Sequence, residues 1–583
     1  MLIWVAIGLL AMVWLWVPAV GPSAASSSYL MATVLLALAT AMRWACSSRS
    51  TGTVTAIGPV VMPVAACALV CAIAAFSARS PLEATACAAA AIVIVQAAYV
   101  GSQGSIGSLM PTTWYLAPWI IAGIVSSLFA LVQYSGNSAH FTPWVTYALP
   151  GEAYANLRQR NQFASLTNIA VASIFAWISS TSMDYRARAA VLMLSSCGVV
   201  LLAAANAASA SRTGLLQLVG VSAIMVAWHR DRNIGTLVAL AAIAYVTASL
   251  LLPHLAGLDP ATHGMFARLK TGDAPCSSRL TLWANVLELI AQKPLAGWGW
   301  GELDYAHFMT LYEGPRFCDI LDNAHNLPLH LAVELGVPVA VLFCTGILWW
   351  VIKNRPWREA DPTRQFAWLV LLIVAIHSMF EYPLWYAPFQ IAGGLCLGLL
   401  SRQPQYANMS LGASQTGRSG TSPTNGRVCS RTHEARHQAR GIAPYAEQLK
   451  IWPLALSAFM MAGCTYAAWD YWRISQIYQL PEDRAPHYRY DTLKKIENSW
   501  LFRRQVEFAE LTTTPVSPAN AERTHALALE LLHFSPEARV VEKLLVSAQY
   551  LGRDDEVRFF AARYRAAFPG PYEEWVSRQS LAR

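Results

Sequence analysis

The sequence predicts an all-α polytopic membrane protein with about thirteen transmembrane helices, a large loop on the outer side and a C-terminal soluble helical domain. The first observation behind this is composition: 55% of the 583 residues are hydrophobic, only 13% are charged, and the mean hydropathy is +0.36. The second is that the apolar residues come in runs of about 20, the length of a helix that spans a bilayer. Strands of a membrane barrel would alternate in short segments instead.

The apolar runs define the expected spans. They are Leu2–Val20, Tyr29–Cys46, Ile57–Phe76, Leu82–Val100, Trp114–Tyr134, Gln162–Ser179, Ala189–Ala207, Leu215–Trp228, Gly235–Leu252, Ala324–Val351, Phe366–Phe380, Leu384–Leu400 and Trp452–Trp469. The first run lacks a charged segment before it and is followed by further spans, so it is expected to be a retained first helix. An uncleaved signal anchor would have the same appearance.

Basic residues in the loops predict the orientation, because loops rich in lysine and arginine stay in the cytoplasm. If the runs alternate in direction, these residues fall on one side: Arg43, Arg49, Arg186, Arg188, Arg230, Arg232, Lys353, Arg355, Arg358, Arg364 and the arginines from Arg402 to Arg440. The N-terminus is therefore expected inside and the C-terminus outside. The net charge of +8 follows from these loops, so no nucleic-acid partner is expected.

The composition divides the chain into four parts. Residues 1–401 form the transmembrane core, in which 254–323 is the large outer loop, and the polar, arginine-rich residues 402–449 form a flexible cytoplasmic linker. Residues 450–469 hold the last span, and 470–583 form an outer helical domain. Within it, residues 526–568 alternate helical patterns with Pro or Gly loops, which resembles a tetratricopeptide-type repeat, although with too few copies for a solenoid.

The eleven cysteines do not form a metal-binding pattern. Most lie inside apolar runs, where a free cysteine acts as a small hydrophobic residue. Cys276 and Cys318 are the two in the large loop. If this loop is extracytoplasmic they could form a disulfide; two free thiols are the alternative. No metal and no cofactor is expected.

The segment from Asp322 to Gly336 is the first candidate for chemistry, because it marks the change from a polar loop to an apolar run. Asp322 or Asn323 is expected to cap the new helix, which would place His325 in its first turn. The positive end of the helix dipole would then keep this histidine neutral and able to accept a proton. A histidine that merely caps the helix is the alternative. His330 and Glu334 lie four residues apart and are expected to form a structural pair.

Arginines on the outer side, against the positive-inside bias, are the second candidates. Arg158 and Arg160 precede a span, Arg212 stands in a very short turn, and Arg279 begins an amphipathic segment. Charges at membrane boundaries are costly unless they are paired or used. Converging arginines would bind a diphosphate, since guanidinium groups hold phosphate oxygens in bidentate fashion. Snorkelling towards lipid headgroups is the alternative.

Another short outer turn lies near the end of the core, in the sequence Glu381-Tyr-Pro-Leu-Trp-Tyr386. Tyr382 could orient a sugar or an acceptor, whereas Tyr386 is expected in the interfacial belt of aromatic residues. His377 precedes Glu381 by four residues and is expected to pair with it.

The chain resembles the superfamily of bacterial O-antigen ligases and polymerases, and within it the protein O-oligosaccharyltransferases. The stretches that carry the resemblance are Arg160-Asn-Gln-Phe163, Ser211-Arg-Thr-Gly214, Ser278-Arg-Leu-Thr-Leu-Trp283, Pro294-Leu-Ala-Gly-Trp-Gly299, Ala324-His-Asn-Leu327, Glu334-Leu-Gly336 and Glu381-Tyr-Pro-Leu-Trp385. They cover roughly residues 150–400. Each is short, but their order and spacing are more specific.

The resemblance implies a multi-pass protein of the bacterial inner membrane with a periplasmic active site. Its donor would be a polyprenyl-diphosphate-linked oligosaccharide, transferred en bloc to a serine or threonine of a pilin-like or other exported protein. Carried over by position, His325 is the catalytic residue and Arg160, Gln162, Arg212, Arg279 and Tyr382 bind substrate. The arginines would neutralise the diphosphate while His325 takes the proton of the attacking hydroxyl.

Other functions stay open at this point. An O-antigen ligase or an O-antigen polymerase would use the same donor with the lipid A core or another glycan as acceptor. A polytopic transporter would carry ionisable residues deep in its spans and an inverted repeat, neither of which is evident here. A membrane scaffold would tolerate replacement of His325.

Overall fold

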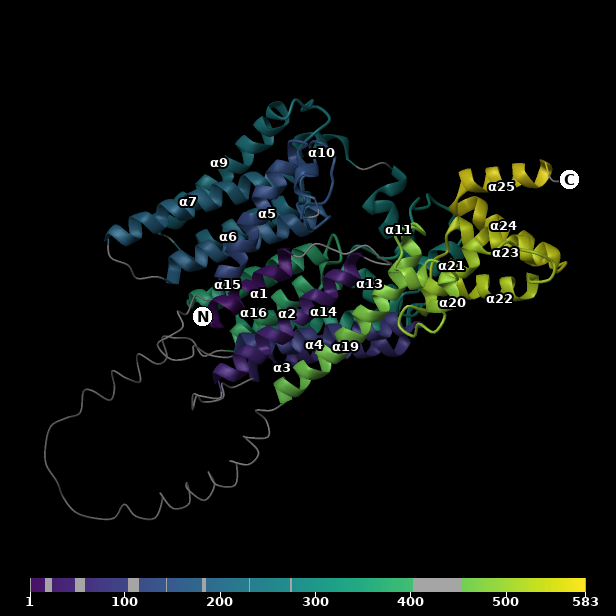
Figure 1. The fold of residues 1–583 in the computed structure, drawn as a ribbon. Helices are drawn as coiled ribbons and strands as arrows, with labels where there is room; N and C mark the ends of the chain where they lie inside the picture. The colour runs from purple at the N-terminus through teal and green to yellow at the C-terminus, as the bar shows by residue number, and fades with distance from the viewer. Residues whose placement is uncertain are drawn as a thin grey trace, which may run out of the picture.

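The computed structural model describes residues 2–15, 24–47, 58–102, 115–142, 144–180, 185–229, 231–272, 275–401 and 452–581. Every regular element in these ranges is a helix, as the composition predicts (Figure 1). Residues 402–449, the expected linker, lie outside the described ranges.

Each expected span overlaps a helix, although residues 16–20 of the first span and residues 57 and 114 lie outside the described ranges. The helices are α1 (Leu2–Leu15), α2 (Ala24–Ser47), α3 (Gly58–Ser77), α4 (Pro81–Ser102), α5 (Ala117–Tyr134), α6 (Arg160–Ser180), α7 (Tyr185–Ala208), α8 (Arg212–Trp228), α9 (Arg232–Leu255), α14 (Val337–Asn354), α15 (Pro362–Ser378), α16 (Ala387–Leu400) and α19 (Trp452–Ser475). Among the described residues, six helices are long and apolar enough to cross a membrane by themselves. The chain is thus a multi-pass membrane protein, while the total of thirteen crossings stays a prediction.

Two boundaries differ from the expected ones. The run expected to be one helix over 324–351 is two helices, α13 (Leu327–Leu335) and α14, separated by Gly336. This glycine has φ of +92°, and a Cβ atom there would lie 2.1 Å from the Leu295 carbonyl oxygen. Only glycine fits this conformation and this close approach. The last span also continues to Ser475, beyond the expected end at residue 469.

The spans pack in two groups (Figure 1). Helices α5, α6, α7 and α9 contact one another in the first group, and α2, α3, α4, α16 and α19 in the second, while α15 contacts both α6 and α16. Small residues let α4 and α16 approach closely: a Cβ on Gly398 would meet the Ala98 carbonyl oxygen at 2.1 Å. Such small-residue contacts are typical of helices packed in membranes.

Hydrogen bonds between loops sort the helix ends into two sets. At one end, Trp228 Nε1 donates to the Pro356 carbonyl oxygen at 3.1 Å, and His229 Nε2 lies 2.7 Å from Gln365 Oε1. These are loops that carry the basic residues. At the other end, Asn161 at the start of α6 contacts Glu381 after α15. The end of α8 thus meets the start of α15, and the start of α6 meets the end of α15, while the orientation of the chain in the membrane stays a prediction.

Residues 256–326 form the large loop, which holds short helices. They are α10 (Met265–Thr271), η3 (Pro275–Ser277), α11 (Arg279–Gln292) and α12 (Leu303–Met309). Cys276 and Cys318 are joined by a disulfide with their Cα atoms 5.3 Å apart, and the Cys318 amide donates to the Cys276 carbonyl oxygen at 3.2 Å. The bond fixes the segment before α11 to the segment that leads towards His325.

The disulfide is expected to stabilise this loop, because it closes a ring over 42 positions of sequence. Replacing Cys318 with serine should cost about 2–4 kcal/mol in the free energy of unfolding. Thermal unfolding of the detergent-purified chain, with and without reductant, measures this. Cys197→Ser, at an exposed free cysteine, is the matched control. Equal unfolding temperatures for Cys318→Ser and the wild type would contradict the expectation.

The C-terminal part is helical after α19, as expected. Its elements are η6 (Gln476–Tyr478), η7 (Pro486–Tyr488), α20 (Thr492–Ile496), α21 (Arg503–Thr513), α22 (Ala521–Leu531), α23 (Ala538–Tyr550), α24 (Asp554–Ala567) and α25 (Pro569–Leu581). Successive helices from α21 to α25 contact one another, while the tetratricopeptide assignment stays a prediction.

This domain packs on the large loop. Phe308 of α12 is part of the hydrophobic core that α22, α23 and α24 form. Glu302, just before α12, accepts from Arg79 Nε at 2.6 Å and lies 2.5 Å from His533 Nδ1. One buried carboxylate therefore connects the α3–α4 turn, the large loop and the C-terminal domain.

Candidate active site

The candidate site is built around Glu381, in the turn between α15 and α16. Its side chain is 7% exposed and contacts three groups from different parts of the chain. His325 Nδ1 lies 2.7 Å from Oε2, while the Arg279 guanidinium forms an ion pair with Oε1. Asn161 Nδ2 also donates to Oε1, at 3.2 Å. Residues far apart in sequence thus meet at one carboxylate.

Two effects oppose each other at Glu381. Burial alone would raise the pKa of its carboxyl, but the hydrogen bond from His325 and the positive charge of Arg279 outweigh burial. The net result is a pKa below its usual value, so Glu381 is a carboxylate at neutral pH.

His325 does not lie in the first turn of a helix, contrary to expectation. Asn326 caps α13, with its side chain accepting from the Leu329 amide at 3.1 Å, and His325 precedes the cap with φ of +50°. Asn323 Oδ1 stabilises this left-handed conformation by accepting from the His325 amide at 2.9 Å. The His325 imidazole therefore lies outside the helix and contacts Glu381.

The contact with Glu381 orients the imidazole. A carboxylate accepts hydrogen bonds, so Nδ1 carries the proton and Nε2 of the neutral ring carries the lone pair. The His325 side chain is 19% exposed, which leaves it accessible to a substrate. Backbone contacts hold it from both sides: Trp283 Nε1 donates to the Ala324 carbonyl oxygen, and Asn326 Nδ2 to that of Met379, each at 3.1 Å.

Tyr382 lies against the candidate base. Its ring is edge-on to His325 with centroids 4.9 Å apart and is stacked with Tyr386 at 6.0 Å. Tyr386 also forms side-chain hydrogen bonds with Tyr382 and Gln162. Tyr386 therefore contacts the site residues, while its place in the interfacial belt stays a prediction. Burial raises the pKa of both tyrosines, so they are neutral hydrogen-bonding groups.

The two remaining predicted arginines lie at the starts of helices. Arg160 begins α6, and its guanidinium contacts Glu152 Oε1 at 2.7 Å. Arg212 begins α8 with an exposed side chain. Ser211, which caps α8, donates to Asn161 Oδ1 at 2.5 Å. The structure thus gathers Arg279, His325 and Tyr382 directly around Glu381, and places Arg160 and Arg212 beside residues of the same network.

Two further expectations concern histidines. His330 Nε2 lies 3.2 Å from Glu334 Oε2, and both side chains are buried, so the predicted structural pair is present. The predicted pairing of His377 with Glu381 is wrong, because the His377 imidazole contacts Ser165 Oγ at 3.0 Å. His377 lies on the face of α15 that packs against α6, whereas Glu381 lies past the end of α15.

Three family models match successive parts of the chain. "Protein glycosylation ligase" matches residues 153–174, "O-Antigen ligase" matches 197–344, and "Virulence factor membrane-bound polymerase, C-terminal" matches 365–582. Each matched part contributes residues to the site: Gln162 lies in the first, Arg279 and His325 in the second, Glu381 in the third. These matches support placing the chain in the bacterial O-antigen ligase and polymerase superfamily, close to the protein O-oligosaccharyltransferases.

Two curated relatives are named O-oligosaccharyltransferases. A "ComP-specific O-oligosaccharyltransferase" of Acinetobacter baylyi (strain ATCC 33305 / BD413 / ADP1) is 26% identical over 258 residues, which is 43% of this chain and 44% of the relative. A "General O-oligosaccharyltransferase" of the same organism is 30% identical over 178 residues, covering 28% and 30% of the two chains. The chain therefore aligns with less than half the length of these superfamily relatives.

Three residues of the candidate site are not predicted from the sequence: Glu381, Asn161 and Ser211. Helical spacing predicts a local pair of Glu381 with His377, and Asn161 and Ser211 enter the sequence prediction only as parts of the motifs that carry the resemblance. The available signal was that all three lie in turns or at helix starts expected on the same outer side as His325.

The lowered pKa of Glu381 predicts how stability depends on pH. A carboxyl with a depressed pKa in the folded state stabilises the fold above its unfolded value, near 4.5, and loses this effect as pH falls through the lower folded value. Glu381→Gln should therefore unfold at a lower temperature than the wild type at pH 7, and the difference should shrink below pH 4. Calorimetry in detergent measures this. A difference independent of pH would contradict the expectation.

Proposed function

We propose that this chain transfers an oligosaccharide en bloc from a polyprenyl-diphosphate carrier to serine or threonine hydroxyls of exported proteins. The observation that carries the proposal is the contact of His325 with Glu381, which Arg279 also binds. The matched O-antigen ligase model and the relatives called O-oligosaccharyltransferases support the same chemistry.

The donor diphosphate would bind near Arg279, with Arg160 and Arg212 close to the same helix starts. The N-termini of α6, α8 and α11 carry these arginines, so their backbone amides and dipoles add further positive potential. Guanidinium groups would stabilise the charge that develops on the departing lipid diphosphate. Tyr382 and Gln162 would contact the sugar or the acceptor hydroxyl.

His325 would act as the general base. Its Nε2 takes the proton of the acceptor hydroxyl while the oxygen attacks the anomeric carbon. The bond from that carbon to the diphosphate oxygen breaks, and its electron pair leaves with the lipid diphosphate. Glu381 stabilises the imidazolium that forms and holds the ring in place. A single displacement of this kind inverts the anomeric centre.

The site would face the periplasm of the bacterial inner membrane, with the N-terminus in the cytoplasm and the C-terminus outside. The loops at the opposite end of the bundle carry Lys353, Arg355, Arg358 and Arg364, which favours that end for the cytoplasm.

The test is transfer by the detergent-purified chain. The donor is a synthetic polyprenyl-diphosphate oligosaccharide, and the acceptors are exported proteins from cells that lack this chain. Mass spectrometry should find glycan on serine or threonine of at least one protein. Transfer to none of them would overturn the proposal.

A ligase or polymerase function is the second candidate, because two of the matched models describe such proteins. The same donor would then be joined to the lipid A core or to another glycan. Adding purified lipid A core and free oligosaccharide to the assay separates these reactions by product mass.

A further inference from the structure

Asn161, the second residue of α6, lies where the ends of α6, α8 and α15 meet. Its amide contacts two side chains: Nδ2 donates to Glu381 Oε1 at 3.2 Å, and Oδ1 accepts from Ser211 Oγ at 2.5 Å. Glu381 follows α15, and Ser211 caps α8. The proposed reaction gives Asn161 no role of its own.

The hydrogen bonds around Asn161 are consistent with one arrangement of the protons. Glu381 is a carboxylate, which only accepts hydrogen bonds, so the amide must turn its Nδ2 group towards it. Oδ1 then faces Ser211 and needs a donor. The Ser211 oxygen accepts from the Gly214 amide at 2.9 Å, so its single proton is left for Asn161. Ser211 therefore orients the amide that holds Glu381.

Buried polar contacts hold the three helices together behind Asn161. The Asn168 amide of α6 donates to the Gly214 carbonyl oxygen of α8 at 2.9 Å, and Gln217 of α8 donates to the Ile373 carbonyl oxygen of α15 at 3.1 Å. Both amide side chains are buried. The helix ends that carry Asn161 and its two partners are therefore held in register.

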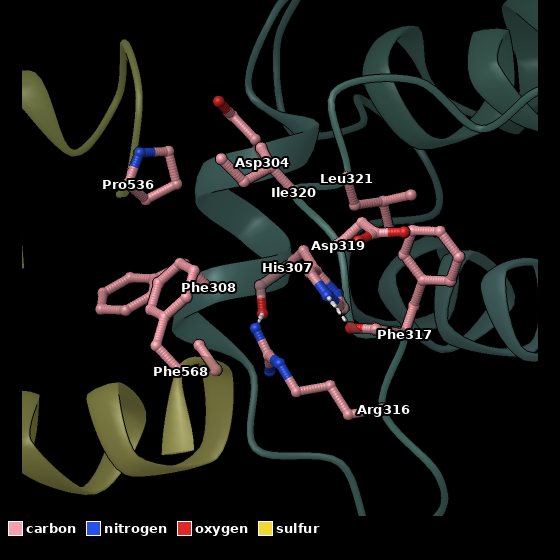
Figure 2. Close-up of a pocket in the computed structure, with 11 residues that line it drawn as sticks. Asp304, His307, Phe308, Arg316, Phe317, Asp319, Ile320, Leu321, Pro536 and Phe568 are labelled. Carbon is pink, nitrogen blue, oxygen red and sulfur yellow. Dashed lines mark hydrogen bonds between the residues drawn. The ribbon is translucent and has the colours of Figure 1, made fainter. Parts of the chain in front are cut away.

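The large loop holds the segment that leads to His325 through contacts of its own. Arg316 donates to the His307 carbonyl oxygen at 2.9 Å, and a ring nitrogen of His307 lies 3.2 Å from the Phe317 carbonyl oxygen (Figure 2). Asn285 Oδ1 of α11 accepts from the Phe317 amide at 2.8 Å. These contacts lie within the loop, so the position of the opposing carboxylate must be set by other residues.

Arg279 and Asn161 share one oxygen of Glu381 but differ in charge. In the proposed reaction the Arg279 guanidinium also binds the donor diphosphate, whose negative charge competes with that of Glu381. The Asn161 amide carries no charge, and its Oδ1 is occupied by Ser211. Asn161 can therefore hold the carboxylate in place while Arg279 binds the diphosphate.

We propose that Asn161 is a positioning residue of the transfer reaction. Oriented by Ser211, it holds Glu381 where the carboxylate fixes the His325 imidazole. The inference rests on the proposed function. Loss of the amide should lower the rate at saturating substrates and leave the binding of donor and acceptor unchanged, because Asn161 acts through Glu381 and not on a substrate.

Asn161→Leu tests this, because leucine keeps the approximate size of the side chain and removes both hydrogen bonds. The matched control is Asn233→Leu. Asn233 is likewise the second residue of a helix, α9, and its Nδ2 donates to a carboxylate, Asp231 Oδ2, at 3.1 Å. Ser211→Ala is the second variant, which removes the hydroxyl that orients Asn161.

The assay uses the full-length chain, synthetic polyprenyl-diphosphate oligosaccharide and the unglycosylated exported-protein fraction, with initial rates measured against the concentration of each substrate. We expect kcat of Asn161→Leu to fall at least about tenfold, since small errors of position are costly in an aligned site. The half-saturating concentrations of donor and acceptor should stay within about twofold of the wild type. Ser211→Ala should show a smaller loss of kcat, and Asn233→Leu none.

A double-variant cycle separates positioning from stability. In the Glu381→Gln background the carboxylate that Asn161 holds is absent, so adding Asn161→Leu should change kcat by less than about twofold. A loss that arose from a weaker fold would persist in this background.

The outcomes separate the two proposals. A wild-type chain that glycosylates no protein would overturn the proposed function and this inference with it. An active wild type with an unchanged kcat in Asn161→Leu would overturn only the positioning role. An equal loss of kcat with and without the Glu381 carboxylate would also overturn it, as would a loss confined to the half-saturating concentration of donor or acceptor.

Discussion

Replacing His325 is expected to reduce glycan transfer by about 10²–10⁴-fold, the usual contribution of a positioned general base. Asparagine is the better first substitution, because it tolerates the left-handed conformation with φ of +50° at this position. Its side chain cannot take up the hydroxyl proton. Transfer should therefore fall while the chain keeps its fold, measured by initial rates at saturating donor and acceptor.

The control for this variant is His254→Ala, at an exposed histidine near the end of α9. It should keep rates within about twofold of the wild type, since surface substitutions away from a site have small effects. Unfolding temperature and donor binding distinguish loss of chemistry from loss of structure. If His325→Asn transferred glycan at the wild-type rate, another residue would have to be the base, and a scaffold role for this segment would regain support.

Replacing Arg279 is expected to have the second largest effect. The rate of transfer at low donor concentration should fall by about 10²–10³-fold. Alanine would remove a guanidinium from the proposed diphosphate site and would also leave buried Glu381 without its ion-pair partner. Arg279→Lys keeps the charge but loses the bidentate geometry, so its loss should be smaller than that of alanine. Transfer measured against donor concentration gives both values.

Lys270→Ala is the matched control for Arg279, because it removes a positive charge from an exposed position of the same loop. If the donor were held only by general electrostatic attraction, both alanine variants would lose the same amount of transfer activity, and that activity would depend strongly on salt concentration. Specific diphosphate binding would confine the large loss to Arg279. Wild-type donor dependence in Arg279→Ala would contradict the assigned role.

The local pattern of apolar residues is sufficient to predict the helices. A run of about 20 apolar residues has few stable alternatives in a membrane, because every backbone amide and carbonyl must be satisfied within the segment. The helix break at Gly336 was missed for a related reason. A single glycine in an apolar run is compatible with a continuous helix, and only the close approach of the Leu295 carbonyl explains why the chain turns there.

The candidate site was predicted less completely. The sequence predicts Arg279 because a charge at a membrane boundary is costly, His325 because it stands at an expected helix start, and Tyr382 because it lies in a short outer turn. Each of these is a local property of the position. The partner of His325 could not be found in this way. Spacing of four residues suggested Glu381 for His377, yet the helix ends after Ser378 and the chain turns Glu381 towards a loop 56 residues away in sequence.

The amino-acid sequence by itself determined that this chain is a helical membrane protein, which residues carry charge at the outer ends of its helices, and which superfamily its motifs resemble. These properties depend on composition and short-range order. The tertiary structure alone decided that one buried carboxylate holds a histidine, an arginine and an asparagine from separate turns, and that the C-terminal domain packs on the large loop. Such contacts join segments distant in sequence, and packing of the whole chain, not local preference, selects them.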